Sequence, residues 1–213
     1  MTPPDKIDKR EQILQAAEQL FAEKGFDGTS VRDIAHEANV NLAMISYYFG
    51  SKEKLLESLI EQRFRISIGI LEELSNDQSL SAWEKIDRLI DYYVERMVTN
   101  RRFHNIMNQE YNTDRSSEIK DLITRIKLQN LERIKGIIVD GQRQKLFRPV
   151  DIELTLGSIM GTIAQVTSLR KLYCNLLQID NTDEASYSNV VIPRLKVHLK
   201  QLMRAHLDIK NEA

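Results

Sequence analysis

The sequence predicts an all-α fold in two parts: an N-terminal three-helix helix-turn-helix domain at residues 1–52 and a larger helical domain at residues 53–213. Three observations favour this fold class. Apolar residues recur at helical spacing along most of the chain, and no segment sustains the alternation of apolar and polar residues that is typical of a β-strand. Glycine and proline, which interrupt helices, account for only 8 and 4 of the 213 residues.

Helix boundaries follow from capping residues and from polar breaks between segments of helical periodicity. Gly25 ends the first predicted helix, and the polar stretch QIDNTDEAS at 178–186 is expected to form a loop before the last helix. Outside the helix-turn-helix, the predicted helices span residues 8–24, 52–74, 82–99, 103–111, 117–141, 151–173 and 191–207.

A helix-turn-helix is predicted after the first helix. Ser30 and Asp33 fit a capping box that starts a short helix. The Asn-Val-Asn triplet that follows tolerates turn geometry, and Asn41 can cap a second helix at residues 42–49. Two short helices joined by a tight turn commonly place the second helix in the major groove of DNA. The sequence therefore favours DNA binding.

The helix at residues 42–49 has two distinct faces. At about 100° per residue, Ile45 and Phe49 point inward, whereas Ala43 and Tyr47 lie on the opposite face. Small and hydroxylated side chains on that outer face suit close approach to base edges, and the helix N-terminus favours phosphate. The residues expected at the DNA surface are Asn41, Leu42, Ala43, Met44, Ser46, Tyr47 and Tyr48.

The segment from about Lys9 to Leu56 resembles the N-terminal domain of the tetracycline-repressor (TetR) family of bacterial regulators. The matching pieces are ILQAAEQLFAEKGFDGTSVRDIAHEANV, the aromatic run SYYF, and GSKEKLL. The resemblance implies a ligand-responsive regulator, by default a repressor, that binds a near-palindromic operator in double-stranded DNA. The DNA contacts that it implies are Arg32, Leu42, Ala43, Met44, Ser46, Tyr47, Tyr48 and Lys52.

Two residues depart from the family pattern. Met44 stands where Thr or Ser is frequent, and Ser46 stands where Tyr is frequent. Both positions lie on the predicted recognition helix. The operator sequence therefore cannot be transferred from relatives.

Two stripes in the C-terminal helices predict a subunit interface. The first consists of small residues that permit close helix approach: Gly157, Gly161, Ala164 and Ser168. The second has spacing like that of a coiled coil: Leu195, Leu199 and Leu202. Packing within one chain is an alternative that the sequence leaves open. The resemblance favours a homodimer, because family members pair through their last two long helices and hold two recognition helices about 34–36 Å apart.

The resemblance also implies a pocket for a small-molecule effector among the middle helices. Aromatic, soft apolar and polar side chains in this region are the expected lining: Trp83, Tyr93, Phe103, His104, Met107 and Tyr111. A pocket of this composition suits a largely apolar molecule, although the sequence does not identify it.

Composition excludes several protein classes. No run approaches the roughly 18 apolar residues of a membrane span, and the N-terminus MTPPDKIDKREQ has charges where a signal peptide would be apolar. A single cysteine, Cys174, fits a reducing compartment, so we expect a cytoplasmic protein. The net charge is only −1, which means that DNA binding must depend on local placement of Lys and Arg.

Catalytic patterns are not recognised in the sequence. The histidines are scattered, and there is no Gly-rich phosphate loop, Cys/His cluster or Glu-x-x-His pair. We therefore expect no enzymatic activity, metal site or cofactor. Two alternatives to a ligand-responsive regulator remain open. One is a DNA-binding factor without a small-molecule effector, architectural or regulated by a partner. The other is a helical ligand carrier whose helix-turn-helix is vestigial.

Overall fold

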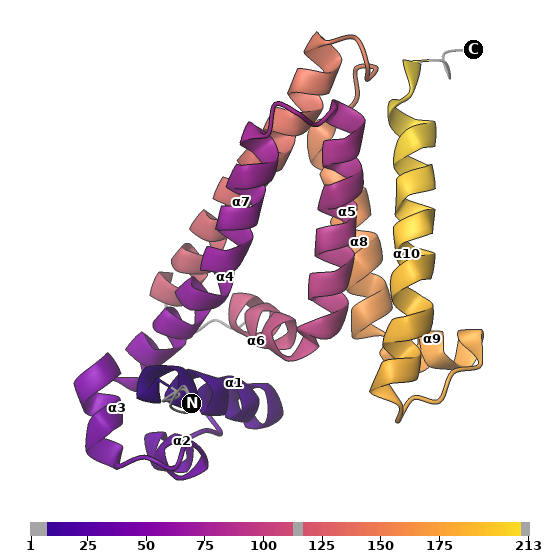
Figure 1. Ribbon diagram of the computed structural model, residues 1–213. Helices are drawn as coiled ribbons and strands as arrows, with labels where there is room; N and C mark the ends of the chain where they lie inside the picture. Colours follow the sequence, from indigo (N-terminus) through magenta and orange to yellow (C-terminus); the bar gives the residue numbers. More distant parts are fainter. Residues whose placement is uncertain (1–7, 113–116, 210–213) are drawn as a thin grey trace, which may run out of the picture. The chain divides into compact units, whose positions relative to one another are not determined.

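The computed structural model describes residues 8–112 and 117–209 (Figure 1). Its helices are α1 (Lys9–Lys24), α2 (Val31–Glu37), α3 (Leu42–Phe49), α4 (Lys52–Asn76), α5 (Ala82–Thr99), α6 (Arg101–Asn112), α7 (Ser117–Arg143), α8 (Ile152–Ser168), α9 (Arg170–Leu177) and α10 (Glu184–Leu207). Within these residues there is no β-strand, only an isolated bridge between Phe147 and Asp208. The all-α prediction is confirmed.

Backbone contacts divide the described chain into two compact units. One contains the residues up to 67 and those from 102 to 126, and the other contains 68–101 and the residues from 127 onward. This division differs from the predicted boundary after residue 52, because the first half of α4 packs into the core of the first unit. The contributing residues are Leu55, Leu56, Leu59 and Ile60. The assignment of separate functions to residues 1–52 and 53–213 stays a prediction.

In the first unit, α1 is fixed to α4 by charged side chains as well as by the apolar core. The Arg63 guanidinium donates to Glu18 at 2.7 Å and to Glu11 at 3.0 Å. Arg63 is only partly exposed, so this forked contact is less screened than an ordinary surface pair. The helices that precede and follow the helix-turn-helix are therefore joined directly.

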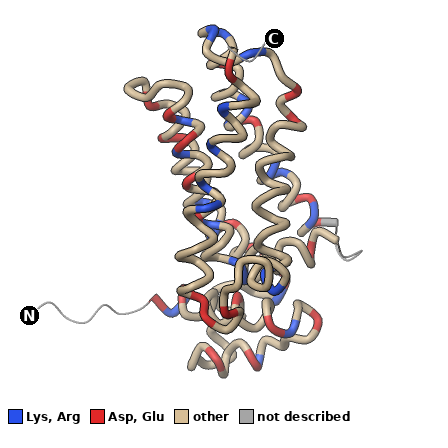
Figure 2. Tube along the Cα trace, turned by 90° about the vertical axis from the view of Figure 1, so that its right-hand side faces the viewer, with Lys and Arg blue, Asp and Glu red and all other residues tan. Residues whose placement is uncertain are grey.

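In the second unit, α5 lies beside α8 and α10 (Figure 1). The helices α5 and α10 run antiparallel, as shown by a ladder of three ion pairs: Asp87 with Arg204, Asp91 with Lys200, and Glu95 with Lys196. Acidic and basic residues are both spread along the described helices (Figure 2). Their distribution agrees with the near-zero net charge of the sequence.

The predicted helix at 151–173 is divided in the structure. α8 ends at Ser168 and α9 begins at Arg170. The Arg170 side chain is buried, donates to the carbonyls of Asn181 and Asp183, and lies over the ring of Tyr187 at 4.4 Å. Leu169, with φ −96° and ψ 36°, separates the two helices. The contacts of Arg170 attach the start of α9 to the loop before α10.

The last helix begins earlier than predicted. α10 starts at Glu184 rather than Val191, and Asp183 is its N-cap, accepting hydrogen bonds from the backbone N–H groups of Ala185 and Ser186. Pro193, inside α10, lies on its exposed side. The polar stretch expected as a loop therefore holds a helix start.

Three further observations bear on the class of protein. None of the helices described is long and apolar enough to cross a bilayer. Within the same residues, no group of three or more His, Cys, Asp or Glu side chains is placed to hold a metal ion. Cys174 is a buried free thiol in the core of the second unit.

Candidate nucleic-acid interface

The local geometry of the helix-turn-helix follows from its capping residues. The Ser30 hydroxyl and the Asp33 carboxylate form the predicted capping box at the start of α2. Hydrogen bonds from the Ser30 side chain and backbone hold the pKa of the Asp33 carboxyl below its usual value. In the turn, Asn39 adopts a left-handed conformation with φ 48°, and Asn41 accepts from the N–H of Ala43 at 2.9 Å. The predicted box and N-cap are confirmed.

The two faces of α3 are confirmed by burial. Ile45 and Phe49 are 2% and 7% exposed and belong to the core of the first unit. Tyr47 is 83% exposed and Tyr48 is 37% exposed, with their rings edge to face at 5.1 Å. The helix ends at Gly50, whose φ of 80° favours glycine. The outer face of α3 is therefore free of contacts that would bury it within the unit.

The remaining predicted DNA contacts fall into two groups. Arg32, Asn41, Leu42, Ala43 and Ser46 are exposed, and Met44 is half-buried. Lys52 is different, because its ammonium donates to the carbonyl of Phe26 at 2.8 Å and to that of Thr29 at 2.9 Å. Two of its three N–H donors are thus used inside the protein.

The predicted effector residues are divided between the two units. Trp83 and Tyr93 are half-buried against the core of the second unit, whereas Phe103 and Met107 are core residues of the first unit. Trp83 packs edge to face on Phe147 at 4.6 Å. Burial of the Tyr93 hydroxyl raises its pKa above the usual range. The aromatic and soft apolar residues that suggested a pocket are, in large part, core.

His104 and Tyr111 complete the predicted effector set. His104 is half-buried beside the Phe103 ring, with centroids 5.9 Å apart, and Tyr111 is 45% exposed. Both lie on α6, in the first unit.

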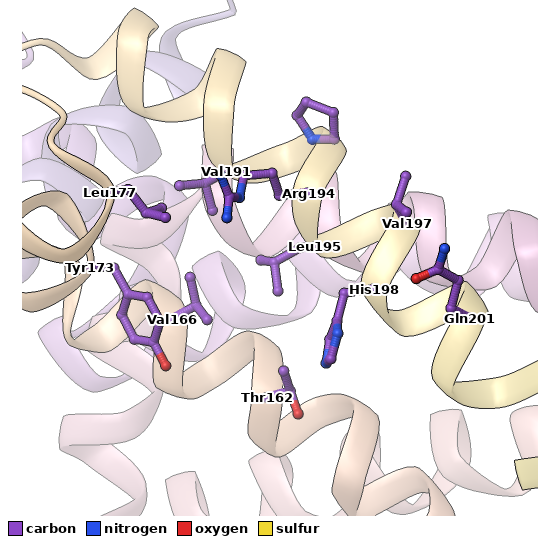
Figure 3. A pocket seen from close by; sticks show the side chains of 11 residues that line it. Thr162, Val166, Tyr173, Leu177, Val191, Arg194, Leu195, Val197, His198 and Gln201 are labelled. Atoms are coloured by element: carbon purple, nitrogen blue, oxygen red, sulfur yellow. The ribbon is translucent and has the colours of Figure 1, made fainter. Parts of the chain in front are cut away.

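A pocket of about 620 Å³ lies elsewhere, on the second unit, between α8, α9 and α10 (Figure 3). Its wall combines apolar side chains with a row of polar ones from α10: Arg194, His198 and Gln201. None of the predicted effector residues lines it. The polar row repeats at helical spacing in the sequence, but such a row is equally typical of a solvated helix face.

The predicted interface stripe on α8 is exposed. Gly157, Gly161 and Ser168 are exposed and Ala164 is half-buried. Among the described residues, no atom beyond the helix's own turns lies within 4 Å of a Cβ built on Gly157 or Gly161. The sequence left open that this stripe packs inside one subunit. In the described part of the subunit, however, the two glycines do not make room for another segment.

The second stripe requires a correction. Leu195 and Leu199 are 6% and 0% exposed and belong to the core of the second unit, where α10 packs on α5, so they do not present an outer face. Leu202 is 37% exposed, and Val197 on the same helix is 55% exposed. A leucine repeat predicts that a helix face is buried, but it does not tell which helix covers it.

Comparisons with known proteins assign both parts of the chain. The family model described as "Bacterial regulatory proteins, tetR family" matches residues 13–59, and the model described as "Tetracyclin repressor-like, C-terminal domain" matches residues 83–190. The "Probable HTH-type transcriptional regulator YttP" of Bacillus subtilis is 31% identical over 66% of this chain and 68% of its own. The repressor NicS of Pseudomonas putida is 32% identical over 71% of each chain.

This chain is also similar to two proteins whose names refer to fatty acids or to an acyl-CoA, and to one other solved structure of a TetR-family regulator. The fatty acid metabolism regulator protein of Bacillus subtilis is 28% identical over 76% of this chain and 84% of its own. The crystal structure of FadR from Bacillus subtilis in complex with stearoyl-CoA matches with a TM-score of 0.66 at 24% identity, covering 91% of this chain and 96% of that one. The TetR-family regulator PfmR from Thermus thermophilus matches with a TM-score of 0.72 at 20% identity, covering 92% and 95%. At these identities the structural matches establish the fold.

Proposed function

Because this chain belongs to the TetR family of bacterial transcriptional regulators, we propose that it represses transcription as a homodimer on a near-palindromic operator and is released by a small molecule. The observation that carries the proposal is the division of α3 into a buried face and an outer face dominated by Tyr47. A helix that binds within a groove needs such an outer face, and a helix that serves only the core does not.

In the proposed complex, α3 enters the major groove and the residues around it contact the backbone. Ala43 lets the helix approach closely, while Ser46 and Tyr47 carry hydroxyl groups that can bond to base edges. The exposed Arg32 on α2 suits a phosphate contact. Leu42 and Asn41, at the N-terminus of α3, lead into the groove.

Pairing of two subunits would use the exposed stripe on α8 together with the outer face of α10. The glycines of the stripe leave room for a second backbone, and the exposed Val197 and Leu202 supply apolar surface on α10. A pair of subunits binds two half-sites at once, which raises affinity well beyond that of one recognition helix.

For the effector, we propose a long-chain acyl compound as the first class to test. Support comes from the names of a relative and of a solved structure, a fatty acid metabolism regulator and a complex with stearoyl-CoA.

The test is a gel-shift with DNA from upstream of the protein's own gene, in the presence of unrelated competitor DNA. We expect a complex that survives the competitor and dissociates on addition of stearoyl-CoA but not of free CoA. Binding that the competitor abolishes would favour an architectural factor. Binding of stearoyl-CoA without specific DNA binding would favour a ligand carrier.

A further inference from the structure

The ammonium of Lys52, at the first position of α4, is held by the turn between α1 and α2. Its Nζ atom donates to the carbonyls of Phe26 and Thr29 and lies 4.2 Å from the centroid of the Phe26 ring. A cation on an aromatic face with two carbonyl acceptors has exchanged part of its hydration for fixed protein partners. Lys52 is therefore occupied in a way that an ordinary surface lysine is not.

The acceptor side of this contact is itself rigid. Thr29 is buried, and its hydroxyl lies 2.8 Å from the carbonyl of Gly25 and 3.1 Å from that of Leu20. The Thr29 N–H donates to the carbonyl of Phe26. Gly25 makes the turn possible through its φ of 71°. The turn is thus anchored to α1, and Lys52 attaches α4 to it.

The position of the contact in the chain gives it a consequence for α3. Thr29 and Lys52 are 23 residues apart, and both helices of the helix-turn-helix lie between them. Their contact closes α2 and α3 into one loop, fixed at its start by Thr29 and at its end by Lys52. A closed loop has fewer conformations than one held at a single end.

We propose that Lys52 is a positioning residue: it holds α3 in the orientation that binds the operator through the Phe26 and Thr29 carbonyls, and not by contacting a DNA phosphate. The proposal rests on the proposed operator-binding function and replaces the phosphate contact that the sequence resemblance implies for Lys52. The proposal predicts that replacing Lys52 loosens residues 30–49 in the protein without DNA. Loss of a phosphate contact would leave the protein without DNA unchanged.

Lys54 provides a matched control. It carries the same charge at the same end of α4, its side chain is 63% exposed, and its ammonium pairs with Glu57 of the same helix at 2.8 Å. Substitution of Lys54 by Met therefore measures the electrostatic effect of losing one positive charge near the DNA. Any excess effect of Lys52→Met measures the attachment to the turn.

The experiment compares wild type, Lys52→Met and Lys54→Met by hydrogen exchange of the free protein and by operator titration at several salt concentrations. We expect faster exchange across residues 30–49 only in Lys52→Met. We also expect its operator affinity to fall by about tenfold or more, the size of effect of lost charge-assisted hydrogen bonds, with the same salt slope as Lys54→Met.

Two results would overturn the proposal. Wild-type exchange in Lys52→Met, with a salt slope lower by about one unit than that of Lys54→Met, would make Lys52 a phosphate contact. Wild-type exchange and wild-type affinity would leave it without a role. If Lys52→Met does not fold, the wild-type protein decides: slowly exchanging Lys52 ammonium protons in nitrogen-15 NMR without DNA support the attachment, and rapid exchange like that of Lys54 contradicts it. Exchange is measured without DNA, so a wild-type protein that binds no operator would refute the proposed function and leave this test intact.

Discussion

Tyr47 is the residue on which sequence-specific binding is expected to depend most. It is 83% exposed, so its replacement by Ala removes little packing from the folded protein. We expect Tyr47→Ala to weaken binding to the operator by about 1–3 kcal/mol while barely changing binding to unrelated DNA. Fluorescence anisotropy with operator and scrambled duplexes measures both affinities. An equal loss on the two duplexes would make Tyr47 a backbone contact, and Tyr47→Phe would isolate the contribution of its hydroxyl.

Residues that act on their immediate neighbours in the chain could be predicted from the sequence. The Ser30 box and the Asn41 cap involve groups two or three residues away, so the residue types alone indicate the contact. The partners of Lys52 are 23 and 26 residues away, and no local pattern specifies them. The difference between the two cases is the sequence separation of the partners.

At the scale of the helices, the contacts of Arg170, which follows the break between α8 and α9, give a prediction about stability. The Arg170 side chain is 7% exposed, whereas that of its partner Glu184 is 67% exposed. We expect Arg170→Met to lower the free energy of unfolding by about 2–4 kcal/mol, because two loop carbonyls lose a buried donor. Glu184→Gln should cost less than about 1 kcal/mol, since that carboxylate faces solvent. Urea denaturation of both variants tests this, and equal losses would show that the ion pair matters more than the carbonyl contacts.

Helical periodicity predicted most helices but not every boundary or every burial partner. Residues 165–173 continue to favour helix, so the break before Arg170 has no local signal. At α10, Pro193 and the acidic residues before it led to a predicted start at Val191, about two helical turns after the observed start at Glu184. Leu195 and Leu199 show the further limit: their spacing indicates a buried face, and only the packing of α10 on α5 identifies what buries it. Phe103 is a similar case: its residue type suggested a pocket lining, and only the packing identifies it as a core residue of the first unit.

At the scale of the whole molecule, a substitution in the stripe on α8 tests how the subunits associate. Since a Cβ at Gly161 meets no described atom within 4 Å beyond its own helix, the single subunit has room for a side chain there. We expect Gly161→Leu to fold normally, to sediment as a monomer, and to lose operator affinity by about a hundredfold or more, because one half-site no longer assists the other. Sedimentation velocity and gel-shift on the same sample measure both effects.

Gly161→Ala is the matched control for this variant. It removes the same helical glycine but adds no bulk beyond Cβ, so it should stay dimeric and gain helix stability of about 0.5–1 kcal/mol. A Gly161→Leu protein that remains dimeric with normal operator affinity would place the interface on another face of the second unit.

The central claim is that two copies of this chain read two half-sites through α3. Footprinting of the DNA upstream of its own gene, with purified full-length protein and excess unrelated DNA, tests this most directly. The predicted result is protection of one near-palindromic site whose half-sites lie about 10–10.5 base pairs apart, with loss of protection in Tyr47→Ala at the same protein concentration. Protection that spreads evenly along the fragment, or that is the same for wild type and Tyr47→Ala, would contradict it.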